Sequence, residues 1–377
     1  MNMMTIEEAK SVIKEIYFNG NGDKTSVMLL GKSGVGKTEG TIQLAKEIAK
    51  ELGKEFVVFT TDKVEELLKE PDRYFVYVEF LLTQSAPEDF IGMPRDSADY
   101  IVYKPLAWAK VLSVCSGILF LDEFTNVQRT DVQSSVLKIL LEKLVGFTKL
   151  SNGVMVIAAG NTAADSDLAV DRLPEPIRRG RVVLFNISLP NFDEWVEYMN
   201  KKYGEEWDKR IALFLRKFPD KFFEDVSRED DGYSPKASPR TWSRVASLSY
   251  RLSDKAREKL FYGLLGSELA TVLNAFLNTK VPDLNVLNSN PIDWRALGTD
   301  SKYFAILELS NVKENELSNY VPIIKYLSEN DREWLVLMFL FISDENKRKR
   351  VALQLKKDCP EAFKVLLEVS ALAKKLL

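Results

Sequence analysis

The stretch Gly31-Lys32-Ser33-Gly34-Val35-Gly36-Lys37-Thr38 matches the pattern G-x-x-x-x-G-K-[ST] at every fixed position. Residues 26–30, just before it, form a short apolar run that predicts a buried strand. After it, apolar residues recur at helical spacing over 42–52, which predicts a helix. A strand, a glycine-rich loop and a helix in this order predict a loop whose backbone N–H groups bind a polyphosphate.

Two side chains of this loop are candidates for direct contact with the bound ligand. The Lys37 ammonium would reach the β and γ phosphates, and the Thr38 hydroxyl would bind Mg²⁺. The alternative is a plain glycine turn that matches the pattern by chance. Such a chance match is expected in roughly one chain in a hundred of this length. The strand and helix that flank the pattern favour the phosphate loop.

The composition is that of a globular protein and narrows the possible chemistry. The 377 residues suffice for two or three domains, and 52 Lys and Arg against 55 Asp and Glu give a net charge of −3. This balance argues against a chain-wide basic surface for nucleic acid, although a local stripe stays open. The chain has no histidine, which excludes His-ligated metal sites and His-activated nucleophiles. Catalysis must use carboxylates, Lys, Arg and bound metal.

The sequence also carries weak indications of location. Its two cysteines, Cys115 and Cys359, are expected to be reduced thiols of a cytosolic protein. We find no run of 18 apolar residues and no signal-peptide core. We therefore expect a cytoplasmic protein without a membrane segment.

A second motif is the run from Gly117 to Glu123, in which apolar residues end in two carboxylates. It predicts a buried parallel strand, and ligands of open α/β sheets bind at the carboxyl end of such strands. Asp122 would hold the Mg²⁺ shell, and Glu123 would orient and deprotonate an attacking water. The alternative is a solvated acidic turn, which the position about 85 residues after the phosphate loop disfavours.

Asn161 follows another apolar run, residues 154–159, that predicts a buried strand. If this strand neighbours the one that ends at Glu123, the Asn161 amide would lie beside Glu123 and could contact the γ-phosphate or the water. By itself, an Asn after a Gly is more often a turn residue.

Arginines supply the candidate cationic groups. Arg178, Arg179 and Arg181 precede a predicted strand at 182–187, and guanidinium groups suit bidentate contact with phosphate. They could stabilise the charge of a transferring phosphoryl group in cis or in trans, or form a solvated basic loop.

A fourth arginine lies at a predicted helix start. Ser238 can cap a helix that Pro239 begins, which puts Arg240 in the first turn. A cation there is unfavourable to the helix dipole, so Arg240 invites a functional explanation.

The remaining segments are less informative. Runs at 56–59 and 74–82 both predict strands, without indicating which is central to the sheet, and 53–73 could be an insertion. Residues 87–104 could form a hairpin or a surface loop. The Pro-, Asn- and Asp-rich stretch 280–302 is expected to be a linker.

Taken together, the motifs resemble AAA+ ATPases, and within them the MoxR-like group. The matching segments are GKSGVGKT (31–38), ILFLDE (118–123), AAGNTAADSD (158–167), LPEPIRRGR (173–181), FDEW (192–195) and ASPRTW (237–242). In addition, APEDFIGMP (86–94) is similar to the segment where that group inserts a hairpin into its second helix. The resemblance covers about residues 25 to 250.

The resemblance implies an α/β fold, with an αβα core around a five-stranded parallel sheet, a small helical lid and a further C-terminal helical region. The corresponding domains would be 1–190, 191–280 and 281–377. It also implies assembly into a ring, usually a hexamer, with ATP and Mg²⁺ bound between subunits.

Individual roles follow from the positions that match the family's motifs. Asn161 would be the sensor 1 residue and Arg240 the sensor 2 residue, whose dipole cost the γ-phosphate would offset. The arginine finger that enters the neighbour's site would be one of Arg178, Arg179 and Arg181, with Arg178 and Arg181 favoured.

The group further implies that a polar residue restrains the catalytic glutamate, and Thr83 or Gln84 would take that place. MoxR-like proteins act as chaperone-like remodellers of protein clients, often with a partner that carries a von Willebrand factor A domain. The leading hypothesis is therefore Mg²⁺-dependent ATP hydrolysis that remodels a protein client.

Two other functions compete with this one. A nucleic-acid motor or an McrB-like NTPase is the alternative, because Asn161-Thr162-Ala163 followed by Asp165 is similar to a stretch of McrB GTPases. The acidic balance makes nucleic acid the less favoured partner. An inactive scaffold would need no water-activating carboxylate, which argues against that third hypothesis.

Overall fold

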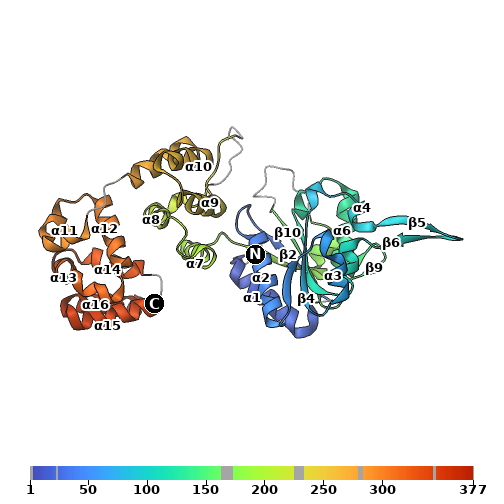
Figure 1. The fold of residues 1–377 in the computed structure, drawn as a ribbon, viewed down its shortest axis with the longest axis horizontal. Coiled ribbons are helices and arrows are strands. Elements are labelled where there is room, and N and C mark those ends of the chain that lie inside the picture. The colour runs from blue at the N-terminus through green and yellow to red at the C-terminus, as the bar shows by residue number, and fades with distance from the viewer. Residues whose placement is uncertain are drawn as a thin grey trace. The chain divides into compact units, whose positions relative to one another are not determined.

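Figure 1 shows the fold in a computed structural model, which describes residues 3–22, 24–162, 173–224, 233–278, 283–342 and 345–376. The chain divides into two compact units. The first comprises Met1–Asp208 and Phe218–Leu252, and the second comprises Lys209–Lys217 and Ser253–Leu377. The division into three domains that the sequence suggests remains a prediction.

The first unit is built on a parallel β-sheet. Among the described residues its strands lie in the order β1-β11-β2-β10-β7-β4-β3, and every adjacent pair is parallel. These strands are β1 (Met3–Met4), β2 (Ser26–Leu30), β3 (Glu55–Val58), β4 (Tyr74–Leu81), β7 (Ser116–Asp122), β10 (Val154–Gly160) and β11 (Val183–Ile187). The predicted parallel sheet is confirmed, and β1 and β3 extend the expected five strands at its two edges.

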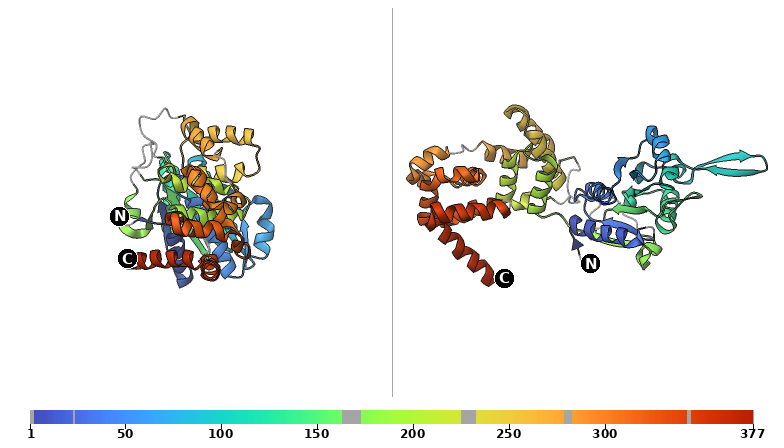
Figure 2. Two further views of the ribbon diagram at one scale, coloured as in Figure 1. Left: turned by 90° about the vertical axis from the view of Figure 1, so that its left-hand side faces the viewer. Right: turned by 60° about the horizontal axis from the view of Figure 1, so that its bottom comes forward.

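Helices cover both faces of the sheet, which gives the predicted αβα core (Figures 1 and 2). On one face, α1 (Ile6–Ile16) and α2 (Lys37–Glu51) share an apolar cluster with the strands. On the other, α3 (Val64–Lys69), α5 (Ala107–Leu112) and α6 (Thr130–Glu142) share a second cluster. Strands β2 and β10 are buried along their whole length, as expected for continuous apolar runs in a doubly covered parallel sheet.

The register of the central strands fixes which residues meet at the carboxyl edge of the sheet. Gly160 at the end of β10 pairs with Leu30 at the end of β2. Two residues earlier, Ala158 pairs with Leu121 of β7. Since the strands are parallel, the segments that follow them leave the sheet at one edge. Strand β4, and not β3, lies next to β7, which answers the question that the sequence left open.

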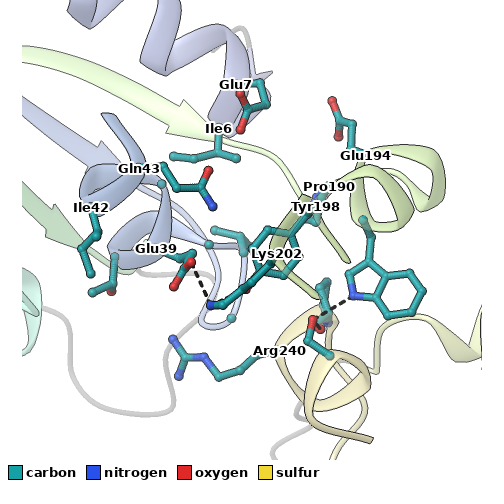
Figure 3. Close-up of a pocket in the computed structure, with 18 of the residues that line it drawn as sticks. Ile6, Glu7, Glu39, Ile42, Gln43, Pro190, Glu194, Tyr198, Lys202 and Arg240 are labelled. Atoms are coloured by element: carbon teal, nitrogen blue, oxygen red, sulfur yellow. Dashed lines mark hydrogen bonds and ion pairs between the residues drawn. The ribbon is translucent and has the colours of Figure 1, made fainter. Parts of the chain in front are cut away.

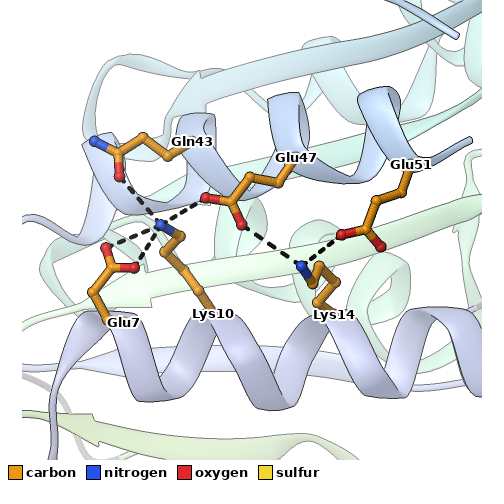
Figure 4. A network of polar contacts seen from close by, with 6 residues as sticks. All are labelled: Glu7, Lys10, Lys14, Gln43, Glu47 and Glu51. Carbon is orange, nitrogen blue, oxygen red and sulfur yellow. Dashed lines mark hydrogen bonds and ion pairs between the residues drawn. The ribbon is translucent and has the colours of Figure 1, made fainter. Parts of the chain in front are cut away.

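A network of polar contacts joins α1 to α2 through Lys10 and Lys14 of α1 (Figure 4). The partners of these two ammonium groups are Glu7, Gln43, Glu47 and Glu51. The Lys10 side chain is only 4% exposed, so its charge requires these partners. The network holds α1 against the helix that begins at the phosphate loop.

Two hairpins leave this core. Strands β5 (Met93–Ser97) and β6 (Tyr100–Lys104) form an antiparallel pair after the short helix α4 (Glu88–Ile91). The sequence left residues 87–104 as either a hairpin or a surface loop, and the structure shows that this segment contains a hairpin. A smaller antiparallel pair, β8 (Leu144–Val145) and β9 (Thr148–Lys149), follows α6.

Two further helices of the first unit follow the sheet: α7 (Phe192–Tyr203) and α9 (Pro239–Ser249). At the start of α7, the Asn191 side chain accepts from the Glu194 N–H, and the Glu194 carboxylate accepts from the Asn191 N–H. Helix α9 begins at Pro239 with Ser238 as its N-cap, as predicted. Short helical turns complete the unit: η1 (Tyr17–Asn21), η2 (Thr61–Lys63), η3 (Leu82–Gln84), η4 (Phe124–Asn126), η5 (Ile177–Arg181) and η6 (Pro219–Lys221).

The second unit is helical, which confirms the helical C-terminal region. Its elements are α8 (Lys209–Lys217), α10 (Asp254–Leu277), α11 (Leu284–Ser289), η7 (Pro291–Ala296), α12 (Thr299–Asn311), η8 (Glu314–Tyr320), α13 (Val321–Asn330), α14 (Arg332–Phe341), α15 (Glu345–Asp358) and α16 (Pro360–Leu376). The prediction of a linker at 280–302 is wrong for the described residues of this range, which contain α11 and η7. Leu284, Leu287 and Trp294 are buried there, so apolar packing overrides the loop-like composition.

Helix α10 is, among the described residues, the one helix long and apolar enough to cross a membrane by length and composition. Gly266 interrupts it with φ 73° and ψ 172°, a conformation that is not helical and that essentially only glycine adopts. A membrane-spanning helix needs about 20 consecutive residues, and neither side of this break reaches that length. The helix is therefore weak support for a membrane segment.

Candidate nucleotide-binding site

The predicted phosphate loop lies between β2 and α2. Gly34 and Gly36 have φ angles of 81° and 96°, in the left-handed region that glycine tolerates without steric cost. Helix α2 begins directly after Gly36, so its N-terminal N–H groups open into the loop. A Cβ on Gly34 would lie 3.3 Å from Ser238 Oγ. The absence of a side chain at Gly34 therefore also allows the N-cap residue of α9 to lie close to the loop.

Lys37 lies inside this loop and is 8% exposed. Its ammonium donates to the carbonyl oxygens of Gly31 at 2.6 Å and Lys32 at 2.9 Å. It also donates to Asn161 Oδ1 at 3.2 Å. The loop lysine and the amide at the end of β10 therefore face the same space.

Thr38 and Asp122 bring two oxygen groups together at the carboxyl edge of the sheet. The Thr38 hydroxyl donates to Asp122 Oδ2 at 2.8 Å. Hydroxyl and carboxylate oxygens are hard ligands that suit Mg²⁺, which usually keeps waters and binds through one or two carboxylates plus substrate phosphates. In the described ranges, no cluster of three acidic or thiol side chains could hold a metal by itself. The pair therefore fits Mg²⁺ that arrives with a polyphosphate.

Glu123 adopts a left-handed backbone with φ 59°, which is uncommon for a residue with a side chain. Its N–H donates to Asp122 Oδ1 at 2.9 Å. Its carboxylate accepts from the Thr83 hydroxyl, with Thr83 Oγ1 2.8 Å from Glu123 Oε2. Thr83, one of the two residues that the resemblance suggested, thus contacts Glu123 in the structure.

Thr125 positions the backbone of Asn161. The Asn161 N–H donates to Thr125 Oγ1 at 2.8 Å. The approach is close, since a Cβ on Gly160 would lie 2.6 Å from Thr125 Cγ2. Thr125 is 4% exposed and belongs to the turn η4 after Glu123. It therefore links the strand end that carries the acid to the strand end that carries the amide.

A cavity of about 340 Å³ opens beside the loop within the first unit (Figure 3). Residues of the loop, α1, α2, α7 and α9 line it, and Arg240 is among them. Its lining residues are Ile6, Glu7, Gly34, Val35, Gly36, Thr38, Glu39, Gly40, Ile42, Gln43, Pro190, Glu194, Trp195, Tyr198, Lys202, Tyr203, Pro239, Arg240, Ser243 and Arg244. A cavity that continues from a phosphate loop into a partly apolar pocket suits a nucleotide.

The arginine cluster lies elsewhere. Arg181 precedes β11, and Val183 of that strand pairs with Val27 near the beginning of β2. The cluster is therefore at the amino edge of the sheet, opposite the phosphate loop. Arg178 Nε donates to the Leu173 carbonyl, and Arg179 pairs with Glu175 at 2.6 Å. Among the described residues, Arg181 makes no hydrogen bond or ion pair.

A comparison with protein families agrees with this site. Residues 27–189 match the family described as "ATPase family associated with various cellular activities (AAA)". The chain carries an AAA ATPase domain. It is therefore a nucleotide-binding enzyme that hydrolyses ATP, and the match contains the phosphate loop, both acidic residues and the arginine cluster.

Solved structures of AAA+ proteins are also similar to the chain. Cdc6p from Pyrobaculum aerophilum has 13% identity and a TM-score of 0.38, covering 84% of this chain and 76% of its own. A point mutant of RuvB from Thermotoga maritima has 15% identity and a TM-score of 0.32, covering 86% and 87%. DnaA of Aquifex aeolicus, bound to AMPPCP, has 14% identity and a TM-score of 0.34, covering 92% and 98%. No curated protein matches the chain significantly.

The site of this AAA domain contains most of the residues that the sequence singled out. One hydrogen bond joins Lys37 to Asn161, and another joins Thr38 to Asp122. Arg240 lines the adjoining cavity. The structure does not bring the arginines that precede β11 to this edge. Sequence reasoning missed Thr125, Glu39, Tyr198 and Lys202, because no local pattern connects them to the loop. The segment 163–167 of the matched motifs lies outside the described residues.

Replacing Thr125 by valine tests whether its hydroxyl positions Asn161. Valine keeps the shape but leaves the Asn161 N–H without its acceptor, which disturbs the amide beside Lys37. We expect the kcat of ATP hydrolysis to fall about tenfold, the equivalent of one lost hydrogen bond, with little change in nucleotide affinity. Thr125→Ser is the matched control and should keep most of the activity in steady-state assays. An unchanged kcat in Thr125→Val would contradict this role.

Proposed function

We propose that the chain is a ring-forming, Mg²⁺-dependent AAA+ ATPase of the MoxR-like kind that remodels a protein client. One observation supports assembly into a ring. The loop, both carboxylates, the amide and Arg240 gather around one edge of the sheet, whereas the arginine cluster precedes β11 at the other edge. For an arginine of this cluster to contact a phosphoryl group bound at the first edge, it must enter the site of another subunit, and a head-to-tail arrangement that closes makes a ring.

The chemistry follows from the side chains at the loop. Glu123 accepts a proton from water while the water oxygen bonds to the γ-phosphorus and the bond to the bridging oxygen of ADP breaks. Lys37, Asn161 and Arg240 stabilise the charge on the transferring group. Thr38 and Asp122 would hold Mg²⁺, which neutralises charge on the β and γ oxygens when bound. The Thr83 hydroxyl competes for the Glu123 carboxylate, so release of that hydrogen bond frees the base.

Glu123→Gln should keep ATP binding and lower hydrolysis by at least about a hundredfold, because the amide cannot accept the proton. With ATP and Mg²⁺, the variant should stay assembled. Light scattering should then show a particle about six times the 42.9 kDa of one chain, and EDTA should remove the effect. Wild-type turnover in this variant would show that Glu123 is not the base. A monomer that binds ATP would contradict the ring.

A mixing experiment tests whether Arg181 acts in trans. Arg181→Ala should bind ATP but lose hydrolysis, because the neighbour's site lacks its cation, and Lys37→Ala should lose hydrolysis through failed binding. In an equal mixture of the two variants, a Lys37→Ala subunit can supply Arg181 to the intact nucleotide site of an Arg181→Ala neighbour. About a quarter of the sites then have both an intact Lys37 and a neighbouring Arg181, so activity should return to roughly a quarter of wild type.

Arg179→Ala is the matched control, since Arg179 pairs with Glu175, and it should hydrolyse ATP normally. If no activity returned on mixing while both variants still assembled, the trans role of Arg181 would be excluded. Loss of activity in Arg178→Ala with normal Arg181→Ala would move the finger to Arg178.

The two hairpins support a protein client. Tyr100 and Ile101 are 65% and 63% exposed on the longer hairpin, and Phe147 is 73% exposed at the tip of the shorter one. Tyr103 lies beside Phe147, with ring centroids 5.1 Å apart. The longer hairpin carries two basic and two acidic residues over 93–104, so it lacks the charge that attracts phosphate backbones. An exposed aromatic surface suits apolar side chains of a protein client, including a partner with a von Willebrand factor A domain.

The hairpin surface can be tested with the double variant Tyr103→Ser and Phe147→Ser. Reduced casein, as an unfolded protein, should stimulate wild-type ATPase activity about twofold or more, and the variant should lose this stimulation while its basal rate is kept. Arg95→Ala on the same hairpin is the matched control. If single-stranded DNA stimulated the enzyme in a salt-sensitive way and casein did not, the nucleic-acid alternative would replace this proposal.

A further inference from the structure

A polar contact joins the last turn of α7 to the first turn of α2, beside the phosphate loop (Figure 3). Lys202 Nζ lies 2.8 Å from Glu39 Oε1 and donates a hydrogen bond to it. Glu39 is two residues after Lys37, so it belongs to the helix that begins at the phosphate loop. Both side chains line the cavity, and each is 38% exposed.

The Lys202 ammonium is held from several sides. It donates to the Tyr198 hydroxyl at 2.9 Å. The Tyr198 and Tyr203 ring centroids lie 5.3 and 5.8 Å from it, within the range of cation–π attraction. Burial disfavours the charged ammonium, but the hydrogen bonds to Glu39 and Tyr198 outweigh burial, so the pKa of Lys202 is raised. Lys202 therefore stays charged and oriented at neutral pH.

The position of Glu39 explains why a cation is needed there. A carboxylate in the first turn of α2 suits the helix dipole, but it lies close to a loop that binds a polyphosphate of the same sign. Two negative groups in a partly desolvated cavity repel each other. Lys202 neutralises Glu39 only when the end of α7 lies against α2, so the nucleotide and this helix contact favour each other.

We infer that the Lys202–Glu39 pair is a latch that holds α7 over the cavity and slows the release of the bound nucleotide. Lys202 is in this sense a positioning residue, because it acts on the nucleotide through Glu39 and through the placement of α7. The inference rests on the proposed function in one respect, namely that ATP and ADP occupy this cavity. Other contacts at the loop, such as the approach of Ser238 to Gly34, come from a different segment and would persist without the latch.

The dissociation rate of a fluorescent ADP analogue, measured by stopped-flow displacement with excess ADP, tests the latch in the full-length chain. Lys202→Met removes the cation and keeps the aliphatic stem, and Glu39→Gln removes the anion. We expect Lys202→Met to release the analogue about fivefold faster, in the upper range for one partly exposed ion pair. Glu39→Gln should release it faster by a smaller factor, because this variant loses the contact with α7 but also loses the negative charge that repels the nucleotide. The association rate should change little, which separates this effect from general damage to the site.

The double variant Lys202→Met with Glu39→Gln decides whether the two residues act as a pair. If they do, the double variant should release ADP no faster than either single variant. Lys201→Met is the matched control, because Lys201 is the exposed neighbour of Lys202 on α7, and it should behave like wild type.

The outcomes separate the latch from the proposed function. Unchanged release in both single variants, or multiplicative effects in the double variant, would overturn the latch and leave the ATPase assignment intact. Failure of the wild-type protein to bind the ADP analogue would overturn both. An equal acceleration in Lys201→Met would show that the effect is a general one of surface charge and would also overturn the latch.

Discussion

The register of three parallel strands is the constraint on which the site depends. Gly160 pairs with Leu30, and Ala158 with Leu121, which brings the ends of β2, β10 and β7 to one edge. A shift of one residue would reverse every side chain of a strand. It would also move Asn161 away from Lys37. Burial of the central strands on both faces makes such a shift costly, because large apolar side chains fill the two clusters between sheet and helices.

Hydrogen bonds from residues beside the site, two of them involving threonine hydroxyls, orient the groups that the strand register brings together. Glu123 has a left-handed backbone, a conformation that costs about 1–3 kcal/mol when a side chain must adopt it. The hydrogen bonds of Asp122 and Thr83 to this residue offset part of that cost. Thr125 positions Asn161 by accepting a hydrogen bond from its backbone N–H. The Glu123 carboxylate and the Asn161 backbone are thus each contacted by a neutral hydroxyl, which adds no charge beside the phosphate loop.

The sequence predicts the parts of this structure that local patterns specify. The phosphate loop, the strand that ends in Asp122 and Glu123, and the N-cap of Ser238 each depend on residues close in the chain. Contacts between distant segments leave no such pattern, so Thr125 and the Lys202–Glu39 pair could not be found that way. The stretch around Trp294 shows the same limit. Its Pro, Asn and Asp residues suggest a linker, but the burial of one indole requires partners from other helices.

Because the chain has no histidine, proton transfer and charge stabilisation fall to carboxylates, lysines and arginines. The two proposals give the reaction two separate geometric controls. Arg181 lies at the amino edge of the sheet, away from its own phosphate loop, and in the proposed ring it would couple hydrolysis to the arrangement of neighbours. Lys202 contacts α2 beside the loop, and as a latch it would couple nucleotide release to the position of α7. Separate controls for hydrolysis and release would let the enzyme hold ADP after the phosphate has left.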